Sequence, residues 1–272
     1  MEVLTIFLSG LITIISPLGV VVDSVVAGQL RSQVKSVEAL AVRVDNTPSY
    51  QPVAGKVDRI RIASRGVEII DDLRIDTLEV ETDPLDININ KIQNLSGLES
   101  IQSSLNKPFQ GGIRLVIKED DLNFALESDS IRKQLQALLD TILPPEAPSF
   151  NIIKLKINFM EKNRLALEIE LEQNGEEGEA PTQLAIAAEV GFEIEQGKKI
   201  KLTDLSAIIN DRKLSPRFAN ILLAGISDQL SLDIFAEQGF LVRVLQVDMN
   251  EESLNIAAFL VLPQSKRMNN LG

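Results

Sequence analysis

The chain contains no cysteine, no histidine and no tryptophan, and Tyr50 is its single tyrosine. Without cysteine and histidine there can be no disulfide, no thiolate nucleophile, no Cys/His zinc site and no histidine general base. These absences together remove the side chains on which many hydrolases and redox enzymes depend.

Basic charge and aromatic rings are also scarce. The chain has 27 Lys and Arg against 39 Asp and Glu, which gives a formal net charge of −12, and 4% of its residues are aromatic. A nucleic-acid partner requires basic charge to displace counterions, and single strands also require aromatic rings on which bases can stack. We therefore expect no nucleic-acid partner.

No catalytic or cofactor signature stands out among the remaining polar residues. Ser215 has no histidine partner, and no glycine-rich phosphate loop is present. One acidic series follows a predicted strand and the turn after it: Glu168, Glu170, Glu172, Glu176, Glu177 and Glu179. Carboxylates two residues apart along a strand fan out in a row, so we interpret them as a solvated face. We expect no enzymatic activity, no metal and no cofactor.

The most persistent pattern in the chain is an alternation of apolar and polar residues over residues 151–195. Its apolar positions are Ile153, Leu155, Ile157 and Phe159, then Leu165, Leu167, Ile169 and Leu171, then Leu184, Ile186, Ala188, Val190, Phe192 and Ile194. A period of two predicts strands with one wet and one buried face, and the short breaks predict an antiparallel meander. At about 3.4 Å per residue, the run 183–195 extends roughly 40 Å.

The rest of the chain predicts helices and strands around this meander. Expected strands lie at 40–45, 57–62, 67–69, 73–76, 78–80, 85–89, 111–118, 198–205, 240–248 and 254–262. Expected helices lie at 23–40, at 119–142 with a break near Ser128, and from the N-cap Ser215 to about Phe235. The last helix would span roughly 30 Å at about 1.5 Å per residue, which matches the length of the meander. The proline-rich stretch 143–148 is interpreted as a hinge within one architecture.

The N-terminal stretch 3–22 carries no charge over about twenty residues, enough to span a hydrocarbon core of roughly 30 Å as a helix. Pro17 and Gly19 interrupt its last third, and no Lys or Arg precedes it, as a secretory signal would require. A membrane anchor is the favoured interpretation; a buried or interfacial helix and a cleaved signal stay open. The predicted organisation is an anchor helix at 1–28, one α+β domain at 29–263, and a flexible tail at 264–272.

Several short segments resemble a known family. They are the stretches 29–34, 52–57, 64–67 and 73–78, and the stretch 112–115 running into 120–123. The chain is similar over about residues 20–262 to the LmeA-type bacterial phospholipid-binding proteins, first catalogued as a domain of unknown function. The resemblance implies the tubular lipid-binding superfold, in which a long, curved antiparallel sheet wraps around a long helix and holds acyl chains between them. It implies no set of catalytic residues.

The leading hypothesis is a membrane-associated protein that binds phospholipid or another acyl lipid, and possible transfer of that lipid belongs to the same hypothesis. The lipid would lie in an apolar groove between meander and helix. The candidate lipid-binding residues are Leu155, Ile157, Leu167, Ile169, Leu184, Ile186, Val190, Phe218, Leu222, Ile226 and Leu230.

Two alternatives stay open. The first is a membrane-tethered structural or interaction domain whose core is dry and packed; the second is an enzyme acting on envelope lipids or glycans. A basic cluster surrounds the start of the predicted long helix: Lys198, Lys199, Lys201, Arg212, Lys213 and Arg217. It is explained either by solubility or by contact with anionic headgroups.

Overall fold

The computed structural model of the chain describes residues 31, 34–46, 54–70, 72–94, 98–142, 148–173, 182–237 and 239–264. The predicted anchor helix at 1–28 lies outside the described residues. So do most of the predicted hinge (143–147) and nearly all of the predicted tail (265–272).

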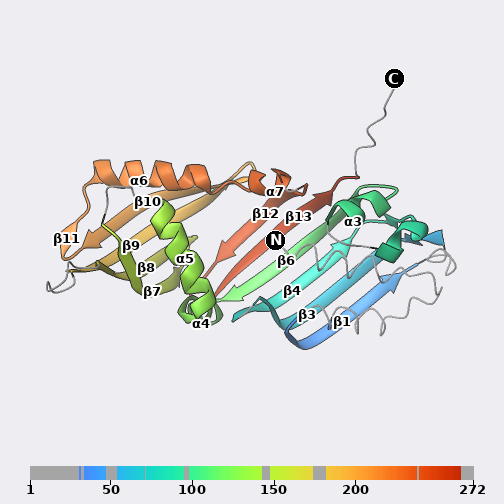
Figure 1. Cartoon of the computed structure of the whole chain (residues 1–272), viewed down its shortest axis with the longest axis horizontal. Helices are drawn as coiled ribbons and strands as arrows, with labels where there is room; N and C mark the ends of the chain where they lie inside the picture. Colours follow the sequence, from blue (N-terminus) through green and yellow to red (C-terminus); the bar gives the residue numbers. More distant parts are fainter. Residues whose placement is uncertain are drawn as a thin grey trace, which may run out of the picture.

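The described part is an α+β structure built on two antiparallel sheets (Figure 1). The first sheet has six strands in the order β1-β3-β4-β6-β13-β12. Its strands are β1 (Ser36–Asp45), β3 (Arg59–Ile70), β4 (Leu73–Thr82), β6 (Phe109–Lys118), β12 (Leu241–Met249) and β13 (Ser253–Leu262). A small two-stranded sheet pairs β2 (Lys56–Val57) with β5 (Leu85–Asp86).

One face of the six-stranded sheet builds the main hydrophobic core. The register places apolar residues opposite one another across all six strands, as in the row Val42, Ile62, Val80, Ile113, Ala258 and Val244. The short helices η2 (Ile89–Asn94), α3 (Leu98–Ser104) and α7 (Asp233–Glu237) contribute apolar residues to this core. Ile60 is 0% exposed and Phe240 is 1% exposed, so this core is closed to solvent.

The opposite face of the same sheet is solvated and charged. Arg43 and Arg61 share Asp45, Arg65 and Arg114 share Glu79, and Arg59 binds Glu81. The hydrogen bond from Arg43 is the main cause that lowers the pKa of Asp45. Exposed pairs of this kind contribute little stability each, but they keep a broad sheet face polar.

The second sheet has five strands in the order β11-β10-β9-β8-β7. Its strands are β7 (Phe150–Met160), β8 (Arg164–Gln173), β9 (Thr182–Glu195), β10 (Lys199–Ile209) and β11 (Arg212–Lys213). The strands of the predicted meander are therefore confirmed, and the fourth strand is longer than expected. Between the sheets in sequence lie α4 (Glu119–Glu127) and α5 (Asp129–Ile142), which break at Ser128 as predicted.

The two sheets lie side by side along the long axis of the molecule, with α4 at their junction (Figure 1). Two turns of the second sheet hydrogen-bond to the outer strand β12. The Asn163 side chain accepts from the N–H of Met249 at 3.0 Å, and the N–H of Val244 donates to the carbonyl of Gly197 at 2.8 Å. These bonds occupy the edge of β12, which would otherwise expose unpaired backbone groups.

The helix predicted to start at Ser215 begins as expected, since its first helical residue is Pro216, but the predicted length to about Phe235 is wrong. Helix α6 (Pro216–Gln229) has 14 residues and therefore spans about 21 Å at about 1.5 Å per residue. The chain after it is held extended along β10, because Ile200 N–H donates to the Leu230 carbonyl and Leu232 N–H to the Lys198 carbonyl. Those bonds to the sheet end the helix, and Phe235 belongs to the separate helix α7.

Two further sequence predictions need correction. Residues 36–40 belong to β1 and not to the predicted helix 23–40, because Ser36 and Leu40 pair with Glu68 and Ser64 of β3. The predicted strands 57–62 and 67–69 are mostly one strand, β3. Gly66 lies inside β3 with a φ of 57°, so it accommodates an irregularity within the strand and does not begin a turn.

The junction yields a testable prediction at Gly197. This residue has a φ of 71°, and a Cβ atom here would lie 2.7 Å from the carbonyl oxygen of Val244. We expect Gly197→Ala to lower the free energy of unfolding by about 1–3 kcal/mol, since it adds backbone strain and a clash at β12. Chemical denaturation of both proteins measures this.

The matched control is Gly112→Ala in β6, because a Cβ atom at Gly112 meets no atom within 4 Å. The control should leave stability unchanged or raise it slightly. Equal stabilities for the Gly197→Ala variant and the unmodified protein would contradict the assigned junction.

Candidate functional site

The five-stranded sheet carries one continuous apolar face. Apolar residues alternate with polar ones along each strand, and the strand register places the apolar residues of neighbouring strands opposite one another. Leu155, Ile169, Ile186 and Ile209 lie opposite one another across four strands, and Ile157, Leu167, Ala188 and Ala207 form the neighbouring row. Leu171 pairs with Leu184, and Leu165 pairs with Val190. The seven candidate residues predicted on the strands therefore share one face.

This face is less well covered than the core of the first sheet. Val190 is 5% exposed, whereas the other six strand candidates are half-buried: Leu155, Ile157, Leu167, Ile169, Leu184 and Ile186. A half-buried apolar row differs from the closed core around Ile60, and it is where additional apolar contact would be stabilising.

Helix α6 lies along β10 at one side of this face (Figure 1). Ala219 and Ser227 are buried, and the Ser227 hydroxyl accepts from the N–H of Leu202 at 3.0 Å. Ile226 is 37% exposed, and Leu230 is half-buried just beyond the end of the helix. Phe218 and Leu222 are residues of α6 whose side chains are outside the described set.

Helices α4 and α5 cover the opposite edge of the sheet, strand β7. The Asn123 amide donates to the Ile157 carbonyl at 2.7 Å and accepts from its N–H at 2.9 Å. Gln136 bonds in the same way to the Phe150 carbonyl and the Ile152 N–H, at 2.6 and 3.0 Å. These amide side chains take the place of a neighbouring strand, a role that nothing in the sequence pattern indicated.

A cavity of about 360 Å³ lies between these two helices and β7. Leu126, Leu135 and Arg132 line it from the helices, and the run 152–156 lines it from the strand. Its volume is at the small end of the range for small-molecule sites, about 300–1,000 Å³. Leu155 belongs both to this cavity and to the apolar face, so the two features are contiguous.

A bulge shifts the alternation predicted for the start of β7. The register slips between Ile152 and Lys154, so that Ile152 and not Ile153 pairs with Leu171. Ile153 is 48% exposed and lines the cavity. The bulge therefore moves an apolar residue that was expected on the buried face to the edge of the sheet.

Several charges on the second sheet are paired. Lys154 lies 3.4 and 3.5 Å from the carboxylates of Glu170 and Glu168, and hydrogen bonding, first to Glu170 and then to Glu168, raises the pKa of Lys154. In the predicted basic cluster, Lys201 pairs with Glu195 at 2.9 Å, which raises the pKa of Lys201 and lowers that of Glu195. Lys198 lies 3.9 Å from Asp233.

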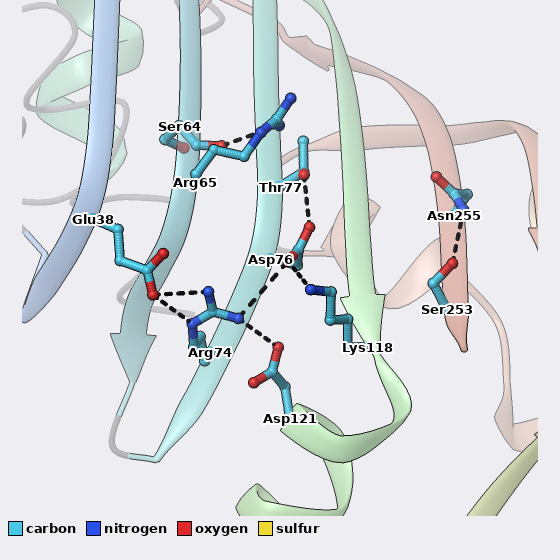
Figure 2. A network of polar contacts seen from close by, with 10 residues as sticks. All are labelled: Glu38, Ser64, Arg65, Arg74, Asp76, Thr77, Lys118, Asp121, Ser253 and Asn255. Atoms are coloured by element: carbon cyan, nitrogen blue, oxygen red, sulfur yellow. Dashed lines mark hydrogen bonds and ion pairs between the residues drawn. The ribbon is translucent and has the colours of Figure 1, made fainter. Parts of the chain in front are cut away.

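A polar network fixes the start of α4 on the first sheet (Figure 2). Arg74 contacts Glu38 of β1 and Asp121 of α4, each at 2.8 Å, and Lys118 contacts Asp76 at 2.8 Å. The hydrogen bond from Lys118 is the main cause that lowers the pKa of Asp76, and that from Arg74 to Glu38 is the main cause that raises the pKa of Arg74. The network orients α4, whose Glu119 and Asn123 then reach β7.

The geometry defines an α+β protein with a closed core under one sheet and a half-buried apolar face on the other. Among the residues that the structure describes, no group of three or more acidic side chains could hold a metal ion. Within the same residues, no helix is long and apolar enough to cross a membrane.

The family follows from a comparison with known proteins. A family model described as LmeA-like phospholipid-binding matches residues 15–259, so the chain belongs to this family. The family resemblance inferred from the sequence is confirmed. A search of curated proteins finds no match to the chain.

The polar network predicts a dependence of stability on pH. Because the pKa of Asp76 is lower in the folded protein than its ordinary value of 3.8, its contribution is present above that value. The contribution is lost as the pH falls through the lowered pKa. We expect Asp76→Asn to be less stable than the unmodified protein at about pH 6, and the difference to shrink as the pH falls below the ordinary value of 3.8. Denaturant titrations at several pH values measure this.

Asp120→Asn serves as the control, since Asp120 is an exposed neighbour of the network on α4. It should leave the pH dependence of the unfolding free energy unchanged. A constant difference between Asp76→Asn and the unmodified protein over the whole pH range would contradict the assigned role of Asp76.

Proposed function

We propose that the protein binds phospholipid or another acyl lipid, with the acyl chains against the half-buried face of the five-stranded sheet between α5 and α6. The observation that carries this proposal is the pair of apolar rows through Leu155 and Leu167, continuous across four strands yet only half-buried at most positions. Each methylene transferred from water to such a face stabilises the complex by about 0.8 kcal/mol. Membership of a phospholipid-binding family supports the same proposal.

The proposed activity is binding without chemistry. The chain has no histidine or cysteine to serve as a general base or thiolate nucleophile. The family description speaks of phospholipid binding and names no reaction. The apolar face can shelter alkyl chains, and shelter of this kind requires no reacting group.

A second candidate is a structural domain in which the same face forms a dry core. Phe159, Leu171 and Val190 favour it, because they are buried to 4%, 7% and 5% exposure without any ligand. The two candidates differ in what the central rows contact: lipid in the first case, and other protein side chains in the second.

Leu167→Asp separates the two candidates, because Leu167 lies in a central row and is half-buried. If the face receives lipid, the carboxylate reaches water once the lipid has left, so the fold persists while uptake of a fluorescent acyl probe is lost. In a dry core, an unpaired carboxylate costs several kcal/mol, enough to unfold a domain of ordinary stability of about 5–15 kcal/mol. Thermal unfolding and probe uptake are measured on the same variant.

The matched control is Ala187→Asp, an exposed position on the opposite face of β9. It introduces the same charge. It should shift the unfolding temperature by less than about 5 °C and leave uptake of the fluorescent acyl probe unchanged. Loss of fold in Leu167→Asp alone would contradict lipid binding at this row. Mass spectrometry of lipids extracted from the purified protein adds a direct measurement, and no co-purified lipid together with no probe uptake would contradict the proposal.

Association with a membrane is the second part of the proposed function. It rests on the charge-free stretch 3–22 together with the phospholipid-binding family. An anchored protein would exchange lipid directly with the bilayer to which it is attached. A lipid taken up on the sheet would then travel only a short distance.

We expect the full chain to fractionate with membranes, and a shortened chain that begins at Gln29 to be largely soluble and folded. The reason is that residues 1–28 would supply the apolar contact with the bilayer. Fractionation and circular dichroism of both chains measure this. Aggregation or loss of fold in the shortened chain would show instead that the segment belongs to the core.

A further inference from the structure

Along the outer edge of β7, Leu155 is a residue to which no described side chain bonds on either backbone group. At this edge, Glu119 accepts from the N–H of Phe159, Asn123 bonds both backbone groups of Ile157, and Gln136 bonds the N–H of Ile152 and the carbonyl of Phe150. By the alternation of an antiparallel pair, the N–H and C=O of Leu155 point to the same edge as those of Ile157. No described side chain hydrogen-bonds to them.

This uncovered position opens into the 360 Å³ cavity between α4, α5 and β7. Leu126 and Leu135 give its wall apolar area. Three cations, Arg132, Lys154 and Lys156, and one carboxylate, Glu127, also line it, so its charged residues are positive on balance. Arg132 and Lys156 are exposed, and Arg132 also donates to the Glu127 carbonyl at 3.1 Å. An N–H donor without a described partner and cations that line the same cavity are groups that can bind an oxyanion, here in a chain whose net charge is −12.

The cavity also adjoins the proposed acyl site at Leu155. Leu155 directs its backbone to the cavity edge, while its side chain belongs to the row with Ile169 and Ile186. A ligand with an anionic head and alkyl chains could therefore place the head at the N–H of Leu155 and its chains along the sheet.

We propose that this cavity binds the phosphodiester head of a glycerophospholipid, through the Leu155 N–H, Arg132 and Lys156. This inference rests on the proposed lipid-binding function and assigns the headgroup end of that site. Phosphate oxygens accept from N–H groups and pair with guanidinium and ammonium cations.

A peptide partner fits the same edge poorly. Strand addition requires several consecutive outward-facing residues to be free. Here Asn123 occupies Ile157 on one side, and Gln136 occupies Ile152 on the other. The free position accommodates a single ligand group and excludes an extended chain.

The test compares three soluble probes on the full chain: dihexanoyl phosphatidylglycerol, dihexanoylglycerol and inorganic phosphate. The double variant carries Arg132→Gln and Lys156→Gln. The control is Lys107→Gln, an exposed cation between α3 and β6, next to the first sheet. We expect the double variant to bind phosphatidylglycerol about tenfold more weakly, because two charge-assisted contacts are lost. Binding of dihexanoylglycerol, and all binding by the control, should change by less than roughly twofold.

The outcomes separate this inference from the proposed function. If the unmodified chain binds neither lipid, the proposed function itself fails. Two results overturn the headgroup assignment when the unmodified chain binds both lipids. In the first, the double variant binds phosphatidylglycerol as tightly as the unmodified chain; in the second, it loses binding of both lipids equally. If inorganic phosphate binds as tightly as phosphatidylglycerol and is lost in the double variant, the site holds free phosphate and the lipid assignment is overturned.

A second measurement avoids substitution altogether. With ¹⁵N-leucine labelling of the unmodified chain, the amide signal of Leu155 should shift on addition of dihexanoyl phosphatidylglycerol more than on addition of dihexanoylglycerol. Equal shifts with both lipids, or no shift with either while binding is observed, would overturn the role of this N–H group.

Discussion

The architecture depends on how the backbone groups at the edges of its sheets find hydrogen-bond partners. An exposed strand edge is costly when buried and prone to association when open. Each covered edge here uses a different device: side-chain amides of α4 and α5 along β7, Ser227 and the chain after α6 along β10, and two turns along β12. The helices of the second sheet are consequently drawn to its sides, and the middle of its apolar face remains half-buried.

The two sheets therefore differ in how far their apolar faces are covered. The first sheet has a closed core, with Ile60 and Phe240 almost fully buried. Arg74 of this sheet pairs with Glu38 of β1 and with Asp121, and so links the sheet to α4. The second sheet has the same chemistry of alternating apolar residues but less cover. A face of this kind is stable enough to fold and still has apolar area to offer a ligand, which is the balance that a lipid-binding protein requires.

Most of the strands could be predicted from the sequence, because the alternation of apolar and polar residues along a strand involves only residues that are neighbours in the chain. The meander and the shared face of the seven strand candidates both follow from it. The end of α6 at Gln229 could not be predicted, since it is set by bonds from residues 230–232 to β10. The cavity escaped prediction for the same reason: Asn123 meets Ile157 across 34 positions of the chain, and no short-range pattern records that contact. The bulge at Ile152 likewise reversed the expected side of Ile153.

The hydrogen bonds that join the second sheet to β12 also bear on where members of the family can differ in length. Asn163 and Gly197 lie in turns, have φ values of 55° and 71°, and accept hydrogen bonds from β12. An inserted residue in either turn would break these hydrogen bonds. The connection between Gln173 of β8 and Thr182 of β9 leaves from the opposite end of the same strands. Insertions and deletions accumulated during evolution should therefore concentrate in that connection, while the two turns on β12 keep a constant length.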